Sequence, residues 1–145
     1  MAITTVRDIM TSPVVTLGIG DTLLFADRLM KLGRIRHLPV VDGDMNLVGL
    51  LTHRMILGAW LSRGNPGSED RVEVAQSVPV EMVMEKDVCS IAPGAPAAEA
   101  AEIIERHKFG CLPVVENGKL VGILTEADFL KFARRYLEAE RSQQP

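Results

Sequence analysis

One threonine and one aspartate stand three residues apart where a strand is expected to lead into a helix. They are Thr125 and Asp128, after an expected strand over residues 120–124. The first turn of a helix exposes N–H groups and the positive end of the helix dipole, so it attracts phosphate. A carboxylate one turn later can accept hydrogen bonds from both hydroxyls of a ribose. The same spacing also forms a capping box, in which both side chains serve the helix's own N–H groups, and the tetrapeptide alone favours capping.

The chain is a tandem repeat, because residues 6–57 recur as residues 80–130 with a shift of 74 and then 73 positions. The clearest match joins residues 37–42 to 111–116, and 47–52 to 120–125. A duplicated unit commonly pairs with itself about a pseudo-twofold axis. Such an axis predicts two related clefts where the copies meet.

The first copy departs from the second at the position of the acid. Thr52 aligns with Thr125, but Met55 aligns with Asp128. A thioether cannot usefully accept two sugar hydroxyls, so the cleft centred on Thr52 and Met55 is expected to be weak or empty. The first copy instead offers two basic residues, His53 and Arg54, directly after its threonine.

Each copy is expected to contain a short amphipathic turn, a strand, a helix, two further strands and a last helix. Asp21 is the expected N-cap of the first long helix, Pro96 suits the first turn of its counterpart, and Asn117-Gly118 predicts a type I′ hairpin. In the first copy the ranges are 6–10, 14–17, 22–32, 38–41, 47–51 and 53–62. In the second they are 80–84, 88–91, 96–107, 112–115, 120–124 and 126–141.

The domain boundaries are expected to follow the repeats. Residues 1–63 form the first domain and residues 77–141 the second. Turn formers and charges in residues 63–70 indicate an exposed connection, so residues 64–76 are interpreted as a linker. Residues 142–145 are expected to be a frayed tail.

Composition favours a compact domain. The 145 residues are 47% hydrophobic and 24% charged, enough for one good core or two small fused ones. With no signal sequence and no apolar run of membrane-spanning length, a cytoplasmic location without membrane contact is expected. The net charge of -3 argues against general nucleic-acid binding. Residues 1–63 hold seven Lys/Arg against five Asp/Glu, whereas residues 77–145 hold eight against eleven, so a small anion would favour the first copy.

No enzymatic or metal chemistry is indicated. Cys89 and Cys111 lie in apolar runs typical of buried strands, where they are expected to be inert core thiols. The three histidines show no metal-ligand spacing with either cysteine. No motif of a serine hydrolase, a zinc protease or a phosphate loop is present. No catalytic residue, metal or required cofactor is therefore expected.

The pattern β-α-β-β-α, written twice with Leu-Pro-Val-Val and Val-Gly-hydrophobic-Leu-Thr at matching places, resembles the cystathionine β-synthase (CBS) domain pair, or Bateman module. The resemblance covers nearly the whole chain outside the linker and tail. It implies an α+β fold of two tandem repeats that pack sheet to sheet with pseudo-twofold symmetry. It also implies homodimers, and an adenosine-containing ligand such as AMP, ADP, ATP or S-adenosylmethionine in the cleft between the repeats.

The resemblance assigns roles to particular residues. Residues 122–128 fit the family pattern Gly-x-x-Ser/Thr-x-x-Asp, which raises the ligand interpretation above capping, although both can coexist. In this family Thr125 would face phosphate and Asp128 ribose, while the alternative for the basic residues is solvated surface. One competent site is therefore expected per chain. Its members are Thr125 and Asp128 from the second copy, with Arg36, His53 and Arg54 near phosphate and Thr16 and Leu17 near adenine from the first.

The expected function is that of a stand-alone regulatory module, not an enzyme, which signals a bound adenine nucleotide to an unidentified protein partner. The alternative is a structural or interaction scaffold with no physiological nucleotide. Apolar stripes on the helices are mostly explained by core packing, but an uncovered stripe would build a homodimer. The stripe residues are Met30, Leu57, Trp60, Leu61, Phe129, Phe132, Ala133 and Tyr136.

Overall fold

The computed structural model describes residues 2–62 and 68–145, which divide into two compact units. The first-repeat unit spans Val15–Val88. The second-repeat unit combines the N-terminal segment through Val14 with Cys89–Pro145. The units therefore do not coincide with the expected domains 1–63 and 77–141, because the start of the chain folds with the second repeat.

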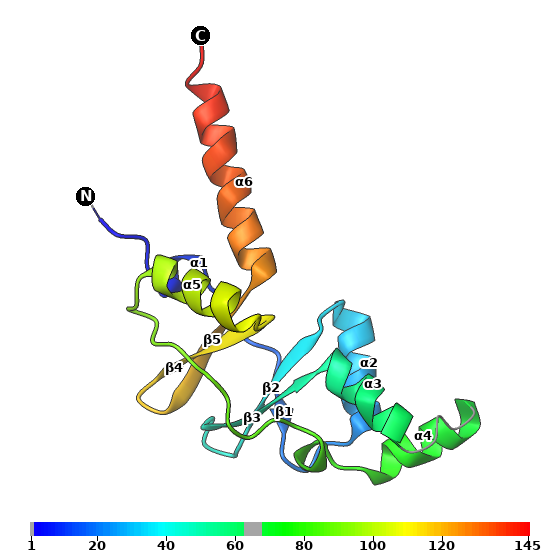
Figure 1. Cartoon of the computed structure of the whole chain (residues 1–145). Helices are drawn as coiled ribbons and strands as arrows, with labels where there is room; N and C mark the ends of the chain where they lie inside the picture. The colour runs from blue at the N-terminus through cyan, green and yellow to red at the C-terminus, as the bar shows by residue number, and fades with distance from the viewer. Residues whose placement is uncertain (1, 63–67) are drawn as a thin grey trace. The chain divides into compact units, whose positions relative to one another are not determined.

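The first-repeat unit contains a three-stranded sheet of order β1-β2-β3, in which β1 and β2 are parallel and β2 and β3 antiparallel (Figure 1). The strands are β1 (Leu17–Gly18), β2 (His37–Val41) and β3 (Leu47–Thr52). The helices are α2 (Leu23–Gly33), α3 (His53–Ser62), α4 (Ser68–Ser77) and the 3-10 turn η1 (Val80–Met82).

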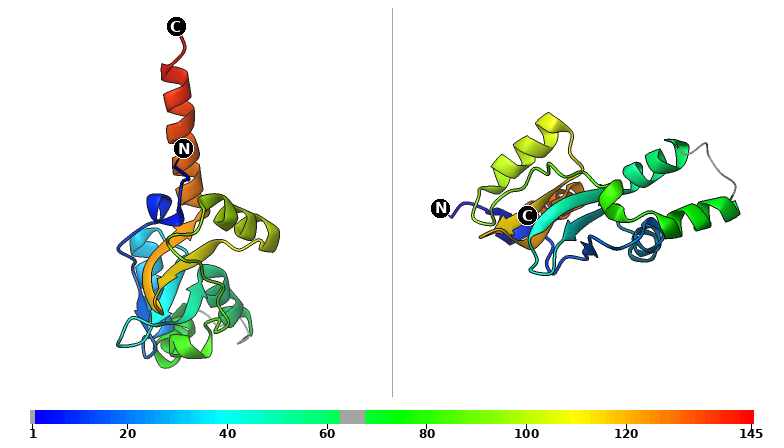
Figure 2. Two further views of the ribbon diagram at one scale, coloured as in Figure 1. Left: turned by 90° about the vertical axis from the view of Figure 1, so that its left-hand side faces the viewer. Right: turned by 90° about the horizontal axis from the view of Figure 1, so that it is seen from below.

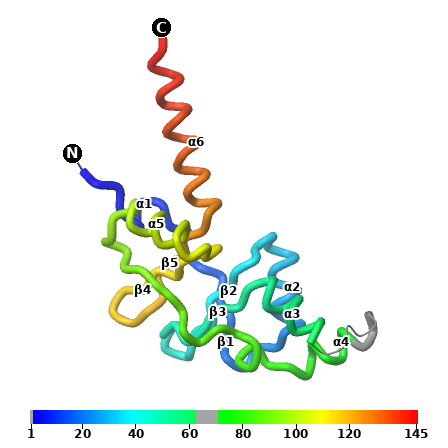
Figure 3. Tube along the Cα trace, viewed as in Figure 1, coloured from blue at the N-terminus to red at the C-terminus, as the bar shows by residue number. Residues whose placement is uncertain are grey.

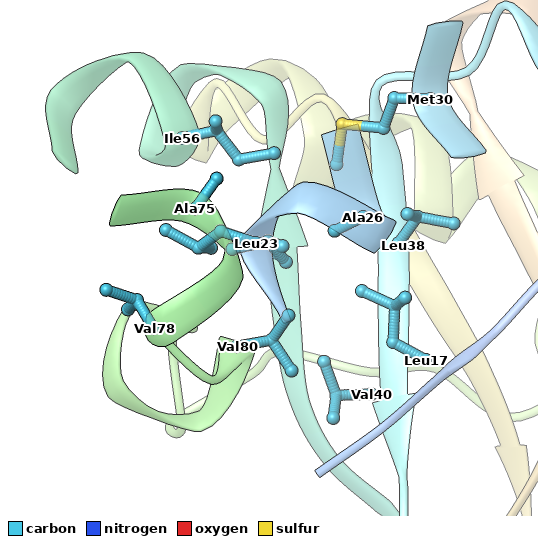
Figure 4. Close-up of a cluster of buried hydrophobic side chains, with 11 residues drawn as sticks. Leu17, Leu23, Ala26, Met30, Leu38, Val40, Ile56, Ala75, Val78 and Val80 are labelled. Atoms are coloured by element: carbon cyan, nitrogen blue, oxygen red, sulfur yellow. The ribbon is translucent and has the colours of Figure 1, made fainter. Parts of the chain in front are cut away.

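The core of this unit explains its elements. Leu23, Ala26 and Met30 recur at helical spacing on α2 and are buried, so that one face of the helix packs into the core. β2 is buried over four consecutive residues, as expected of a strand covered on both faces. Figure 4 shows the side chains gathered in this core, among them Met30, which is 3% exposed and is a core residue rather than part of a free stripe.

The second-repeat unit contains the antiparallel hairpin of β4 (Cys111–Glu116) and β5 (Lys119–Thr125). Its helices are α1 (Val6–Ile9), α5 (Ala97–His107) and α6 (Glu126–Ser142). Asn117 and Gly118 have φ values of 52° and 80°, which confirms the type I′ turn. The strand expected over residues 88–91 is reduced to a single parallel bridge between Ile91 and Val114.

Two short segments at the starts of the repeats, residues 5–11 and 79–85, are exchanged between the units. We call them the leader segments (Figure 3). In the first, Thr11 forms an antiparallel bridge with Ile123 of the second repeat. In the second, Glu85 forms the equivalent bridge with Leu50 of the first repeat. Each leader segment therefore completes the unit built around the other repeat, which explains the division of the chain.

A methionine of each leader segment packs closely against a glycine of the repeat that the segment joins. A Cβ added at Gly122 would lie 2.5 Å from the sulfur of Met10, and one added at Gly49 would lie 2.3 Å from the sulfur of Met84. Since real Cβ atoms do not approach other atoms so closely, a larger residue at either glycine would force the methionine side chain to move. The four residues form two equivalent pairs in the repeat alignment.

Three local expectations are corrected by the structure. The N-cap of α2 is Thr22, whose hydroxyl accepts a 3.3 Å bond from the N–H of Phe25, while the Asp21 carboxylate accepts one from the N–H of Gly18. Helix α4 occupies much of the expected linker, with Ala75 in the core; residues 63–67 lie outside the described part. Cys111 is buried as expected, but Cys89 is exposed and is not a core thiol.

The last helix differs in its surroundings from the others. It reaches Ser142, one residue into the expected tail, and Pro96 is the N-cap rather than the first residue of α5. Beyond its first turn α6 extends away from the rest of its unit (Figure 2), and every residue from Leu130 onward is exposed. No helix among the described residues combines the length and apolarity needed to cross a membrane.

Candidate functional site

The start of α6 forms the capping box. Thr125 is the N-cap in extended conformation, and Asp128 is the third residue of the helix. The Oδ2 atom of Asp128 accepts a hydrogen bond of 2.9 Å from the N–H of Thr125 and one of 3.3 Å from its hydroxyl. The capping interpretation of this pair is therefore correct.

Asp128 has a further partner that the sequence does not indicate. Its Oδ1 atom accepts a 2.7 Å hydrogen bond from the hydroxyl of Thr11, in the first leader segment. Asp128 is 6% exposed. Among the described residues it is the one charged or polar residue that is buried. Burial of a carboxylate is costly unless donors compensate the charge, and three donors do so here. Asp128 thus joins the leader segment, the end of β5 and the start of α6.

The equivalent position in the first repeat has no such network. The hydroxyl of Thr52 accepts a 3.2 Å hydrogen bond from the N–H of Met55, so Thr52 caps α3 without help from an acid. Met55 is partly buried and packs against the core of its unit. The two helix starts therefore differ in how they are capped: α3 is capped by a threonine alone, and α6 by a threonine together with a buried carboxylate.

Basic residues gather instead at the start of α3. The carbonyl of Arg36 accepts a 2.9 Å bond from the N–H of His53, and His37 pairs with Thr52 across β2 and β3. Arg36, His53 and Arg54 consequently share the end of the sheet at which α3 begins. Arg36 and Arg54 are exposed, His53 is half-buried, and none of the three forms an ion pair with a described residue.

A fourth cation lies close in sequence to this cluster. Arg34 ends α2 in the left-handed conformation, with a φ of 52°, two residues before Arg36. Helix N-termini carry positive partial charge, and unpaired arginines add to it. The end of the first-repeat unit next to α3 is therefore an electropositive surface suited to an anion. The corresponding turn of the second-repeat unit holds Lys108 and Gly110, followed by the acidic start of α6.

Two more predicted residues lie at the first strand. Thr16 is half-buried, whereas Leu17 is 1% exposed and its side chain belongs to the core of the first-repeat unit. Only the backbone of Leu17 is therefore available to a ligand. Of the seven predicted site residues, Thr125 and Asp128 belong to the second-repeat unit and the other five to the first-repeat unit. Within the described ranges, no group of three or more His, Cys, Asp and Glu side chains is placed to hold a metal.

Comparison with known proteins agrees with the resemblance. A family model described as CBS domain matches residues 6–62 and 80–135. A CBS domain-containing protein of Dictyostelium discoideum is 33% identical over 135 residues, covering 92% of this chain and 93% of the relative. A candidate acetoin utilization protein from Vibrio cholerae, known from its crystal structure, has a TM-score of 0.85 and 38% identity, covering 99% of this chain and 100% of that chain.

Another similar crystal structure contains a nucleotide. CBSX2 in complex with AMP has a TM-score of 0.78 and 24% identity, covering 91% of this chain and 97% of that chain, an identity at which the likeness concerns the fold alone. Three further relatives are longer, and this chain spans 15%, 42% and 23% of them. The two family-model matches and the full-length relative show that the chain belongs to the CBS domain family, with an α+β fold and two copies of the domain in tandem.

Proposed function

We propose that the chain is a regulatory module that binds one adenosine-containing ligand, with AMP, ADP and ATP as the leading candidates and S-adenosylmethionine as the alternative. The observation that carries the proposal is the unneutralised cluster of Arg36, His53 and Arg54 at the start of α3. Cations without partners on a helix N-terminus attract phosphate. The AMP-bound relative lends support through its shared fold.

The residues of the proposed site have separate tasks. Asp128 accepts hydrogen bonds from the ribose hydroxyls, and Thr125 faces the phosphate while its hydroxyl stays bonded to Asp128. Arg36, His53 and Arg54 neutralise the phosphate charge. Thr16 and the backbone of Leu17 border the adenine. Because Met55 replaces the acid in the other repeat, we propose one competent site in each chain.

Regulation, rather than catalysis, is the proposed outcome of binding. A ligand shifts a conformational equilibrium only by its difference in affinity for the two states. Neutralising the mutual repulsion of Arg36 and Arg54 by one phosphate, to which His53 can add a hydrogen bond, provides such a difference. The altered state then acts on a separate protein partner.

We also propose that two chains associate through exposed helix faces. Leu130, Tyr136 and Leu137 on α6 are 71%, 63% and 60% exposed, and Leu57 and Leu61 on α3 are 47% and 69% exposed. Exposed apolar side chains in such number mark an interface. Trp60 and Phe129, also expected in the stripes, pack partly against the two cores. Sedimentation velocity at micromolar concentration tests the proposal, and a monomer mass would contradict it.

A scaffold without a nucleotide is the second candidate. It is favoured by one observation: the carboxylate of Asp128 already has three donors from the protein itself. In this case the capping box and the bond from Thr11 explain Thr125 and Asp128, and the basic residues at α3 are solvated surface.

Thermal unfolding with added AMP, ADP, ATP or S-adenosylmethionine separates these candidates. A ligand at one hundred times its dissociation constant adds about 2.7 kcal/mol to the free energy of unfolding, which raises Tm by several degrees. Asp128 variants are unsuited to this test, because they also lose the helix cap. The double variant Arg36→Gln/Arg54→Gln removes two phosphate contacts instead, and Arg28→Gln on α2 is the matched control. We expect the shift in wild type and control but not in the double variant, whereas no shift in any protein would favour the scaffold.

A further inference from the structure

The buried carboxylate of Asp128 has limited room for new donors. Each carboxylate oxygen offers about two lone-pair sites. Oδ2 accepts from both the N–H and the hydroxyl of Thr125, so its sites are filled. Oδ1 accepts from the hydroxyl of Thr11 and has about one site left. In this state the carboxylate can take one further donor and not two.

A ribose presents two neighbouring hydroxyls, and both would donate to the same carboxylate. One of them can use the remaining site on Oδ1. The second requires a donor already in place to leave. The hydroxyl of Thr11 is the candidate, because the N–H and the hydroxyl of Thr125 both belong to the capping box that begins the helix.

The hydroxyl of Thr11 is free to leave without loss of its segment. The backbone of Thr11 is held separately, since its N–H donates to the carbonyl of Ile123 at 2.8 Å and its carbonyl accepts from the N–H of Ile123 at 3.0 Å. Rotation about one side-chain bond therefore breaks the contact with Asp128 and leaves this bridge intact. Thr11 is exposed, so the released hydroxyl can bond to water.

We infer that Thr11 is an internal competitor of the ligand: its hydroxyl occupies the Asp128 oxygen that the second ribose hydroxyl uses, and binding of a full ribose displaces it. The inference rests on the proposed function. Thr11 then lowers the affinity for ribose-containing ligands while it stabilises the unliganded protein. It also couples the site to the first leader segment through the Thr11 hydroxyl, which alternates between contact with Asp128 and contact with water.

The other repeat supports the pairing of donor and acid. Glu85 bridges to Leu50 as Thr11 bridges to Ile123, and Met55 stands where Asp128 stands. That unit therefore has neither the hydroxyl donor nor the carboxylate at these positions. A donor on the leader segment occurs only in the copy that has an acid for it to occupy.

Titration calorimetry of leader-segment variants tests the inference. Thr11→Val keeps the shape of the side chain and removes the hydroxyl, while Thr11→Ser keeps the hydroxyl. Thr5→Val is the matched control, because it removes a hydroxyl that bonds to Asp8, another carboxylate of the same segment. Each protein is titrated with AMP, ADP, ATP and their 2′-deoxy forms.

We expect Thr11→Val to bind the ribonucleotide about tenfold more tightly than wild type, and Thr11→Ser and Thr5→Val to match wild type. The gain should vanish with the 2′-deoxy form, whose single hydroxyl fits the vacant site without displacing Thr11. A loss of packing alone would not depend on the 2′-hydroxyl. Equal or weaker binding of the ribonucleotide by folded Thr11→Val would overturn the inference and leave the proposed function standing.

The remaining outcomes are also decisive. If neither wild type nor Thr11→Val binds any of the nucleotides, the inference and the proposed function both fail. If Thr11→Val does not fold, the affinities of the wild-type protein for ribose and 2′-deoxy nucleotides test the inference instead. Displacement of Thr11 should then leave the ribose and 2′-deoxy forms within about threefold in affinity, whereas a preference above about tenfold for ribose would contradict competition.

Discussion

Replacing Asp128 with alanine removes the acceptor of three hydrogen bonds that join the leader segment, the end of β5 and the start of α6. Loss of the capping-box bonds from Thr125 to Asp128 costs about 1 kcal/mol. Loss of the bond from the Thr11 hydroxyl to a charged acceptor costs about 1.5–3 kcal/mol. Because Thr11 is exposed and can bond to water, the lower part of the range applies. We therefore expect the free energy of unfolding to fall by about 2–3 kcal/mol.

Urea unfolding followed by far-ultraviolet circular dichroism measures this loss. In a chain of this length it corresponds to a fall in Tm of about 5–10 °C. Asp8→Ala is the matched control, because Asp8 forms the same capping box with Thr5 at 2.8 and 3.1 Å but is exposed. A smaller loss is expected there. If Asp128→Ala loses no more stability than Asp8→Ala, the structural role of the Thr11 bond is refuted.

Three other predictions concern the first leader segment. Val6→Ala removes a fully buried side chain and should cost about 2 kcal/mol, with hydrogen exchange accelerated in β4 and β5; acceleration confined to β2 and β3 would contradict the exchange of leader segments. Gly122→Ala places a Cβ against Met10 and should cost about 1–3 kcal/mol, part of which Met10→Ala should restore, whereas strictly additive losses would argue against the contact. The pKa of Asp8 is lowered from 3.8 by hydrogen bonds from the N–H and hydroxyl of Thr5. The ionised Asp8 therefore contributes its full share to the free energy of unfolding above pH 3.8, and this share is lost as the pH falls through the lowered pKa of the folded state. The difference in free energy of unfolding between wild type and Asp8→Asn should disappear in acid. A difference that persists in acid would contradict this origin.

The elements that the sequence predicts well are those with strong local signals. The long helices of both repeats follow apolar positions at helical spacing, and the β4–β5 turn follows from two residues that accept positive φ. The shorter elements are less well predicted: the strand expected over residues 88–91 forms only the bridge between Ile91 and Val114.

The pairing of each leader segment with the other repeat is not predictable from the sequence. Residues 5–11 look like the start of the first repeat, yet Thr11 lies on Ile123, more than one hundred positions later. No local pattern distinguishes pairing with one copy from pairing with the other, because the copies are alike. The donor to Asp128 was missed for this reason. The contacts Met10/Gly122 and Met84/Gly49 indicate which repeat each leader segment joins, and they are recognised only in the structure.

The residue types of the candidate site are predictable from the sequence, but the hydrogen bonds and the burial of those residues are not. Thr125 and Asp128 were identified with two compatible roles, and the structure establishes the capping role. Burial of Leu17 restricts it to backbone contacts, which an apolar residue at a strand end does not disclose. The cluster at α3 was expected from Arg36, His53 and Arg54, and the backbone bond between Arg36 and His53 brings two of them together.

We propose that this CBS domain pair binds an adenosine-containing ligand at one site. Titration calorimetry of the wild-type chain with AMP, ADP, ATP and S-adenosylmethionine measures this binding. We expect saturable binding of at least one of them, with one ligand per chain. Failure of all four to bind at concentrations up to about 1 mM would contradict it.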